Sequence, residues 1–114
     1  MAARRGEIWR VSLDPIEGHE QAGTRPALIV SADGLNASAA GLVIIVPLTR
    51  TERRLPTRVE IAPPEGGIQV RSFAMCEQIR AVSVDRLRDG PWGAPVAASV
   101  MVQVELLLRR LLGL

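Results

Sequence analysis

The chain has 114 residues, of which 47% are hydrophobic, together with one cysteine and a formal net charge of +2. This composition predicts one domain, spanning residues 1–114, and it excludes a scaffold built on intrachain disulfides. All 14 basic residues are arginines, which permits a nucleic-acid partner because arginine binds phosphate through paired hydrogen bonds. A genome rich in G and C would give the same bias, and the small net charge does not predict strong nonspecific binding.

The sequence indicates a cytoplasmic protein rather than a membrane protein. The longest apolar run, LVIIVPL at 42–48, is too short to cross a bilayer. No apolar segment follows the basic start MAARRG, so no signal peptide is expected. The lone Cys76 fits a reducing compartment and is interpreted as a small buried side chain rather than a nucleophile.

The first predicted element is a strand in GEIWRVSL, residues 6–13, where side chains alternate between two faces. One face carries Ile8, Arg10 and Ser12, and the other carries Trp9, which we expect to point to the core. The pattern therefore predicts a half-buried strand.

Three segments follow the loop that ends at Thr24. The stretch RPALIVS at 25–31 predicts a second strand, and ADGLNASAAG at 32–41 predicts a loop or one short helical turn. The run GLVIIVPLT at 41–49 is continuously apolar and β-branched, which is typical of a strand buried on both faces.

A charged loop, RTERRLP, precedes another alternating segment, TRVEIAP at 57–63. Alternation predicts a strand with Val59 and Ile61 inward and with Arg58 and Glu60 outward.

The remainder of the chain predicts more strands and a terminal helix. IQVRSFAMCEQIRAV at 68–82 is long enough for one bent strand or two short ones, and Ser83 is the expected N-cap of a single helical turn. The segment at 95–112 has the start and stop signals of a helix, with Pro95 near the first turn and Gly113 just after the end. Its apolar stripe comprises Val96, Val100, Val104, Leu107, Leu108 and Leu111.

Val102 and Leu106 add apolar surface on another side of this helix. So wide a stripe indicates either a second contact surface, such as a dimer interface, or a helix that is simply well buried. The whole pattern predicts a mainly β fold of five to seven short antiparallel strands with a C-terminal helix, forming a small barrel or a curled sheet.

Familiar catalytic and metal-binding motifs are missing from the sequence. GHEQAG lacks the lysine and the following helix of a phosphate-binding loop, one His and one Cys cannot supply a zinc site, and no nucleophile-elbow motif occurs. We therefore expect no metal and no cofactor. If the strands at 25–31 and 41–49 pair antiparallel, Arg25 and Thr49 share a rim. The alternative is that Arg25 forms an ion pair with Glu20 and that Thr49 is an ordinary turn hydroxyl.

Several motifs in order resemble the MazF/PemK family, toxins of bacterial toxin–antitoxin pairs. They are GEIWRVSLDP, GHEQAGTRPALIVS, VPLT, RLPTRVEI and CEQIR, and the similarity covers nearly the whole chain. The resemblance implies an SH3-like small barrel (MazF/PemK/CcdB-like) that acts as a homodimer. It also implies a metal-independent, sequence-specific endoribonuclease that cuts single-stranded RNA by 2′-hydroxyl attack, and an antitoxin partner.

The same resemblance implies roles for particular residues. Arg25 and Thr49 match the family's catalytic arginine and threonine, while Glu20 and Gln21 match a polar pair in its substrate loop. Gln78 of CEQIR matches a residue that faces the site, and His19 stands where the commonest family loop has serine.

The chemistry needs a general base, for which Glu20 is the preferred candidate and His19 the second. His19, Gln21 and Gln78 are expected to contact RNA. Arg50, Arg53 and Arg54 form either a patch that follows the phosphates or a merely solvated charged hairpin.

Two other functions stay open on the sequence. One is a toxin of the same fold without catalysis that binds and inhibits DNA gyrase, and the other is an SH3-like RNA-binding module. The pair Arg25 and Thr49 favours the nuclease over both.

Overall fold

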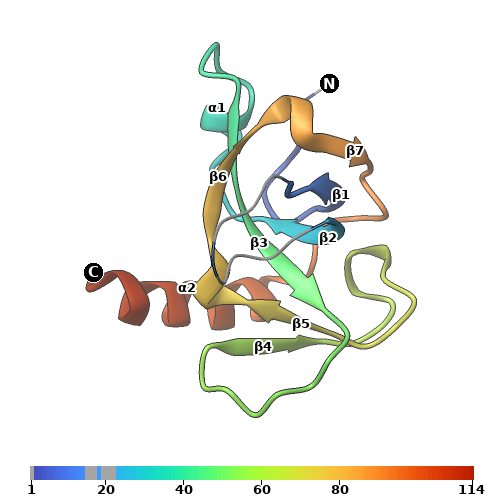
Figure 1. The fold of residues 1–114 in the computed structure, drawn as a ribbon, viewed down its shortest axis with the longest axis vertical. Helices are drawn as coiled ribbons and strands as arrows, with labels where there is room; N and C mark the ends of the chain where they lie inside the picture. Colours follow the sequence, from blue (N-terminus) through green and yellow to red (C-terminus); the bar gives the residue numbers. More distant parts are fainter. Residues whose placement is uncertain (1, 15–17, 19–22) are drawn as a thin grey trace.

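The computed structural model describes residues 2–14, 18 and 23–114. His19, Glu20 and Gln21 lie outside the described residues. Figure 1 shows a curled sheet with a long helix, α2, running along one side. The strands are β1 (Ile8–Ser12), β2 (Thr24–Ile29), β3 (Leu42–Thr49), β4 (Arg58–Ile61), β5 (Ser72–Met75), β6 (Arg80–Ser83) and β7 (Leu87–Asp89). The helices are α1 (Asp33–Asn36) and α2 (Ala98–Leu112), with three 3₁₀ turns, η1 (Glu65–Gly67), η2 (Cys76–Gln78) and η3 (Val84–Arg86).

The described strands form one seven-stranded sheet, as predicted, in the order β4-β5-β3-β2-β1-β7, with β6 also paired to β3. All of the pairings are antiparallel. The first half of β3 pairs with β6 and its end pairs with β5, so β3 joins two sections of the sheet. The sheet is not closed, because β4 and β7 end the path without pairing to each other within the described residues.

The core consists of two clusters on opposite faces of β2 and β3. Leu28 and Val46 belong to the cluster that also contacts β4, β5 and α2, whereas Ile29 and Ile45 belong to the other. Successive side chains of a strand point to opposite faces. Both faces are therefore covered, and this explains the continuous apolar run of β3 and confirms the prediction made for it.

Two predictions about side-chain direction are wrong. Ile8 was placed on the outer face with Arg10, but it is fully buried in the cluster beneath α2, while Val11 is buried in the other cluster. Buried side chains therefore lie on both faces of β1, although Arg10 is exposed and Trp9 is only half-buried. Arg58 was placed outward, but its side chain is 9% exposed because it forms an ion pair with Glu77.

Most of the local signals in the second half of the chain are confirmed, but α2 begins three residues later than predicted, so Pro95 and Val96 precede the helix. The segment at 68–82 forms two short strands separated by η2, and the Ser83 hydroxyl accepts a hydrogen bond of 3.2 Å from the Asp85 amide, capping η3. Helix α2 begins at Ala98, after Pro95, and Gly113 ends it in the left-handed conformation (φ 71°).

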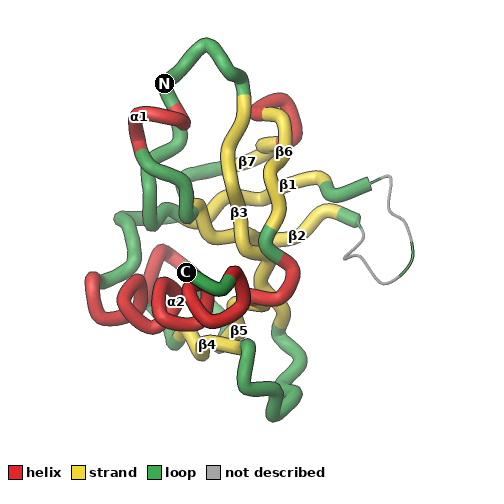
Figure 2. Tube along the Cα trace, turned by 90° about the vertical axis from the view of Figure 1, so that its left-hand side faces the viewer, coloured by secondary structure: helices red, strands yellow, loops and turns green. Residues whose placement is uncertain are grey.

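Figure 2 shows α2 in front of the sheet, close to β4 and β5. Val100, Met101 and Val104 face the core, whereas Val102 and Leu106 are 51% and 53% exposed. The predicted stripe is thus buried in the first half of α2, partly buried at Leu107 and Leu108, and exposed at Leu111. The second apolar side remains on the surface. Among the described helices, none has the length and apolar character needed to cross a membrane.

Candidate active site

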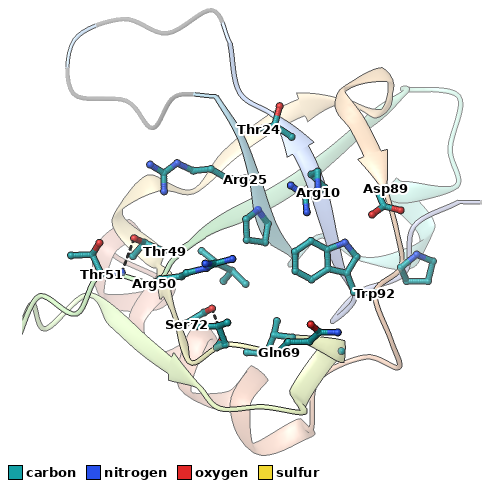
Figure 3. Close-up of a pocket in the computed structure, with 16 residues that line it drawn as sticks. Arg10, Thr24, Arg25, Thr49, Arg50, Thr51, Gln69, Ser72, Asp89 and Trp92 are labelled. Carbon is teal, nitrogen blue, oxygen red and sulfur yellow. Dashed lines mark hydrogen bonds between the residues drawn. The ribbon is translucent and has the colours of Figure 1, made fainter.

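A groove of about 850 Å³ opens at the end of the sheet where β2 begins and β3 ends. We call it the central groove. It is lined by Arg10, Thr24, Arg25, Pro26, Leu48, Thr49, Arg50, Thr51, Gly67, Ile68, Gln69, Val70, Ser72, Asp89, Pro91 and Trp92. Figure 3 shows Arg25, Thr49 and Arg50 on one side, with Arg10 and Trp92 facing them and Gln69 and Ser72 below. Its charged lining consists of three arginines and one carboxylate, which favours an anionic ligand.

Strand pairing brings Arg25 and Thr49 together. The printed register of β2 and β3 joins Ala27 to Pro47 and Leu28 to Val46. Arg25 and Thr49 lie two residues beyond the pair of Ala27 with Pro47, at the same end of the two strands. Both residues line the central groove. The antiparallel pairing assumed from the sequence is therefore present.

The Thr49 hydroxyl is oriented by its own turn. Its Oγ1 accepts a hydrogen bond of 3.2 Å from the Thr51 amide. This contact occupies a lone pair of the oxygen, so the hydroxyl proton is left to donate elsewhere. Because Thr49 is half-buried at the wall of the groove, the geometry is that of a hydrogen-bond donor held ready for a ligand oxygen.

The basic loop after β3 reaches the groove only in part. Arg50 lines it, whereas Arg53 and Arg54 are exposed farther along the loop and do not. Gln78 also lies away from the groove, in η2, a turn that packs against α2. The structure thus brings Arg25, Thr49 and Arg50 into one site, but it does not bring Gln78, Arg53 or Arg54 to it.

Sequence reasoning missed the opposite wall of the central groove. Arg10 lies opposite Asp89 in the pairing of β1 with β7, and Arg10 also lies opposite Pro26 in the pairing of β1 with β2. Its guanidinium carbon is 5.4 Å from the centre of the Trp92 ring. The alternation of β1 had already set Arg10 on the face opposite to Trp9, but only the tertiary fold makes it part of the central groove.

The described groups with displaced pKa values lie outside the central groove. Burial alone would raise the pKa of Glu77, but hydrogen bonds from Arg58 and Thr57 outweigh it and hold the pKa below its usual value. Burial raises the pKa of the Cys76 thiol to about 11, in keeping with the predicted buried, unreactive side chain. No group of three metal-ligating side chains is found among the described residues.

Comparison with known proteins gives a consistent result. The family model of PemK-like, MazF-like toxins of type II toxin–antitoxin systems matches residues 4–112. Endoribonuclease MazF9 of Mycobacterium tuberculosis is 42% identical over 89 residues, which cover 74% of this chain and 75% of that protein.

Two solved structures share the fold over almost their whole length. The crystal structure of MazF from Deinococcus radiodurans has a TM-score of 0.88 and 27% identity, covering 100% of this chain and 99% of that one. An endoribonuclease in complex with its cognate antitoxin, from a mycobacterial species, has a TM-score of 0.80 and 28% identity, covering 99% and 97%.

Proposed function

Because the chain belongs to the family of PemK-like, MazF-like toxins of type II toxin–antitoxin systems, we propose that it is an endoribonuclease toxin that cuts single-stranded RNA at particular sequences. The single observation that carries the choice of site is that Arg25, at the start of β2, and Thr49, at the end of the paired strand β3, both line the central groove. The similarity to a named endoribonuclease supports the reaction class. It does not favour the gyrase inhibitor or the noncatalytic RNA-binding module.

The proposed reaction uses the substrate's own 2′-hydroxyl as nucleophile. Its oxygen attacks the adjacent phosphorus, and the bond to the 5′ oxygen of the next nucleotide breaks, which leaves a 2′,3′-cyclic phosphate and a 5′-hydroxyl. Negative charge grows on the non-bridging oxygens in the transition state. The Arg25 guanidinium supplies a fork of donors to these oxygens, and the Thr49 hydroxyl supplies one more.

A base must take the 2′-hydroxyl proton, and a proton must be returned to the leaving 5′ oxygen. A guanidinium with a pKa above ~12 is a poor base. We assign the base role to the Glu20 carboxylate, five residues before Arg25 in the loop that leads into β2. His19 is the second candidate because its unperturbed pKa of about 6.5 suits proton transfer near neutral pH.

The RNA on either side of the scissile phosphate needs further contacts. Arg50 is exposed at the groove and suits the next phosphate. We extend the path along the charged loop through Arg53 and Arg54. His19 and Gln21 of the preceding loop serve as base contacts, and Gln78 is retained as an RNA contact although it lies outside the groove in a single chain.

We also propose a homodimer and an antitoxin partner. The exposed apolar side of α2, carrying Val102 and Leu106, supports a protein contact there, and a structural relative was solved with its cognate antitoxin. Sedimentation at micromolar concentration is expected to give a dimer, and a monomer contradicts this assignment. The lone buried Cys76 supports a cytoplasmic location.

The deciding experiment is RNA cleavage in the presence of a chelator, with the product ends identified chemically. We expect cyclic phosphate and 5′-hydroxyl ends from the wild-type protein and no cleavage by Arg25→Ala. The matched control is Arg88→Ala, which removes an exposed arginine outside the groove. Tight RNA binding without cyclic phosphate points to the binding module instead, and full activity in Arg25→Ala removes Arg25 from the mechanism.

A further inference from the structure

The wall of the central groove that faces Arg25 has a chemistry of its own. Trp92 is the one aromatic side chain among the described residues that line the groove, and it is half-buried. The Arg10 guanidinium lies over its ring at 5.4 Å. Figure 3 shows Asp89 beside this pair, on the side away from Arg25. A π-surface, a guanidinium plane and a carboxylate therefore lie together across the groove from the proposed reaction centre.

Trp92 is held firmly by backbone contacts. Its amide donates a 3.0 Å hydrogen bond to the carbonyl of Ile8 in β1. On its other side, the chain at Gly67 passes so close that a Cβ there would lie 2.3 Å from the Trp92 carbonyl oxygen, and Gly67 has φ +86°. Glycine at this position permits both the close approach and the left-handed conformation. The aromatic wall is thus built into the fold before any ligand arrives.

We propose that Arg10, Trp92 and Asp89 form a nucleobase subsite that binds a base flanking the scissile phosphate. This inference rests on the proposed function. The base stacks on the platform made by Arg10 and Trp92, since unpaired bases stack on both aromatic rings and guanidinium planes. The Asp89 carboxylate accepts a hydrogen bond from the edge of the base.

The charge pattern favours a base over a second phosphate at this wall. Arg10 alone would suit a phosphate, but Asp89 lies opposite it in the strand register, and an ionised carboxylate repels a phosphodiester. A neutral base meets no such penalty. A carboxylate only accepts hydrogen bonds. The subsite therefore prefers bases with an exocyclic amino group, namely cytosine, adenine and guanine, over uracil, whose single N3–H donor lies between two carbonyl oxygens that repel the carboxylate.

The test is cleavage of an RNA with randomised sequence, with the 5′ ends of the products mapped. At one position flanking the cut, the wild type is expected to discriminate against uracil, and Asp89→Asn is expected to lose that discrimination. Arg88→Gln, which changes the neighbouring exposed residue outside the groove, is the matched control. An unchanged base profile in Asp89→Asn overturns the role of Asp89.

Stacking is tested at Trp92. Loss of a stacking ring typically weakens binding by roughly 5- to 150-fold, equivalent to about 1–3 kcal/mol. We expect Trp92→Leu to lower kcat/KM by that factor through KM, and Trp92→Phe to restore most of it. Equal kcat/KM in wild type and Trp92→Leu overturns the platform, as does a loss in Trp92→Leu that appears in kcat alone.

A binding measurement separates this proposal from the cleavage activity itself. Random 2′-fluoro oligonucleotides lack the nucleophilic hydroxyl, and we expect them to quench tryptophan fluorescence in the wild type. Trp92→Phe should lose the quenching while keeping the signal of Trp9, which lies outside the groove. Absence of quenching in the wild type overturns the subsite whether or not the protein cleaves RNA. Quenching without cleavage refutes the nuclease function alone.

Discussion

Replacement of Thr49 by valine removes one hydroxyl from the central groove and keeps the β-branched shape of the side chain. That hydroxyl makes one hydrogen bond in the structure and is assigned a second one in the proposed reaction. The oxygen accepts from the Thr51 amide at 3.2 Å, and its proton is directed to a non-bridging phosphate oxygen in the proposed transition state. Loss of a donor that acts on transition-state charge costs on the order of 2.7–4 kcal/mol, or about 10²–10³ in kcat.

Because the groove is open to solvent, we expect the lower end of this range for the loss in kcat. Thr49 is only half-buried, so water can replace part of the lost hydrogen bond. We therefore expect Thr49→Val to lower kcat by about 10²-fold with a smaller change in KM, measured on a short fluorogenic RNA. Thr49→Ser, which keeps the hydroxyl, should recover most of the activity.

A second threonine provides the matched control. The Thr57 hydroxyl donates a 2.7 Å hydrogen bond to Glu77 and lies outside the groove. Thr57→Val should lower stability but leave kcat of the folded protein unchanged. A wild-type kcat in Thr49→Val, or equal losses of kcat in both variants, refutes the reasoning that Thr49 acts on the phosphate.

Three further predictions concern the rest of the molecule. Glu77→Gln breaks an ion pair in which the Arg58 side chain is 9% exposed and the Glu77 side chain 25%. It should lower the free energy of unfolding, measured in urea, by roughly 2–3 kcal/mol, somewhat less than for a fully buried pair. The control Glu52→Gln, which removes a partner of the exposed Arg71, should have no measurable effect. The pKa of Glu77 is lowered in the folded protein. The carboxylate therefore makes its full contribution to the free energy of unfolding above the pKa of the unfolded chain, about 4.3, and loses it as the pH falls below that value. The wild type should consequently lose more stability than Glu77→Gln between neutral and acidic pH. Cys76, with its pKa raised to about 11, should resist a thiol reagent at pH 8 in native protein and react readily in urea; fast native reaction contradicts the buried assignment.

The sequence predicted the parts of the site that depend on neighbouring strands. The apolar runs before and after the α1 segment predicted β2 and β3, and their antiparallel pairing brought Arg25 and Thr49 to one end of the sheet, where both line the central groove. Ser83 and Gly113 were predicted as caps because capping is a local property of backbone geometry. The direction of Arg58 was not predictable in this way, because its partner Glu77 lies in another element.

What the sequence by itself determined is therefore most of the elements, though not β7, together with the family and the rim shared by Arg25 and Thr49. Only the tertiary structure decided that buried side chains lie on both faces of β1, that the turn η2, which contains Gln78, packs against α2, and that Arg10 and Trp92 complete the central groove. The physical reason is distance along the chain. Alternation and turns act over a few residues, whereas the pairing of β1 with β7 is chosen by the packing of the whole domain.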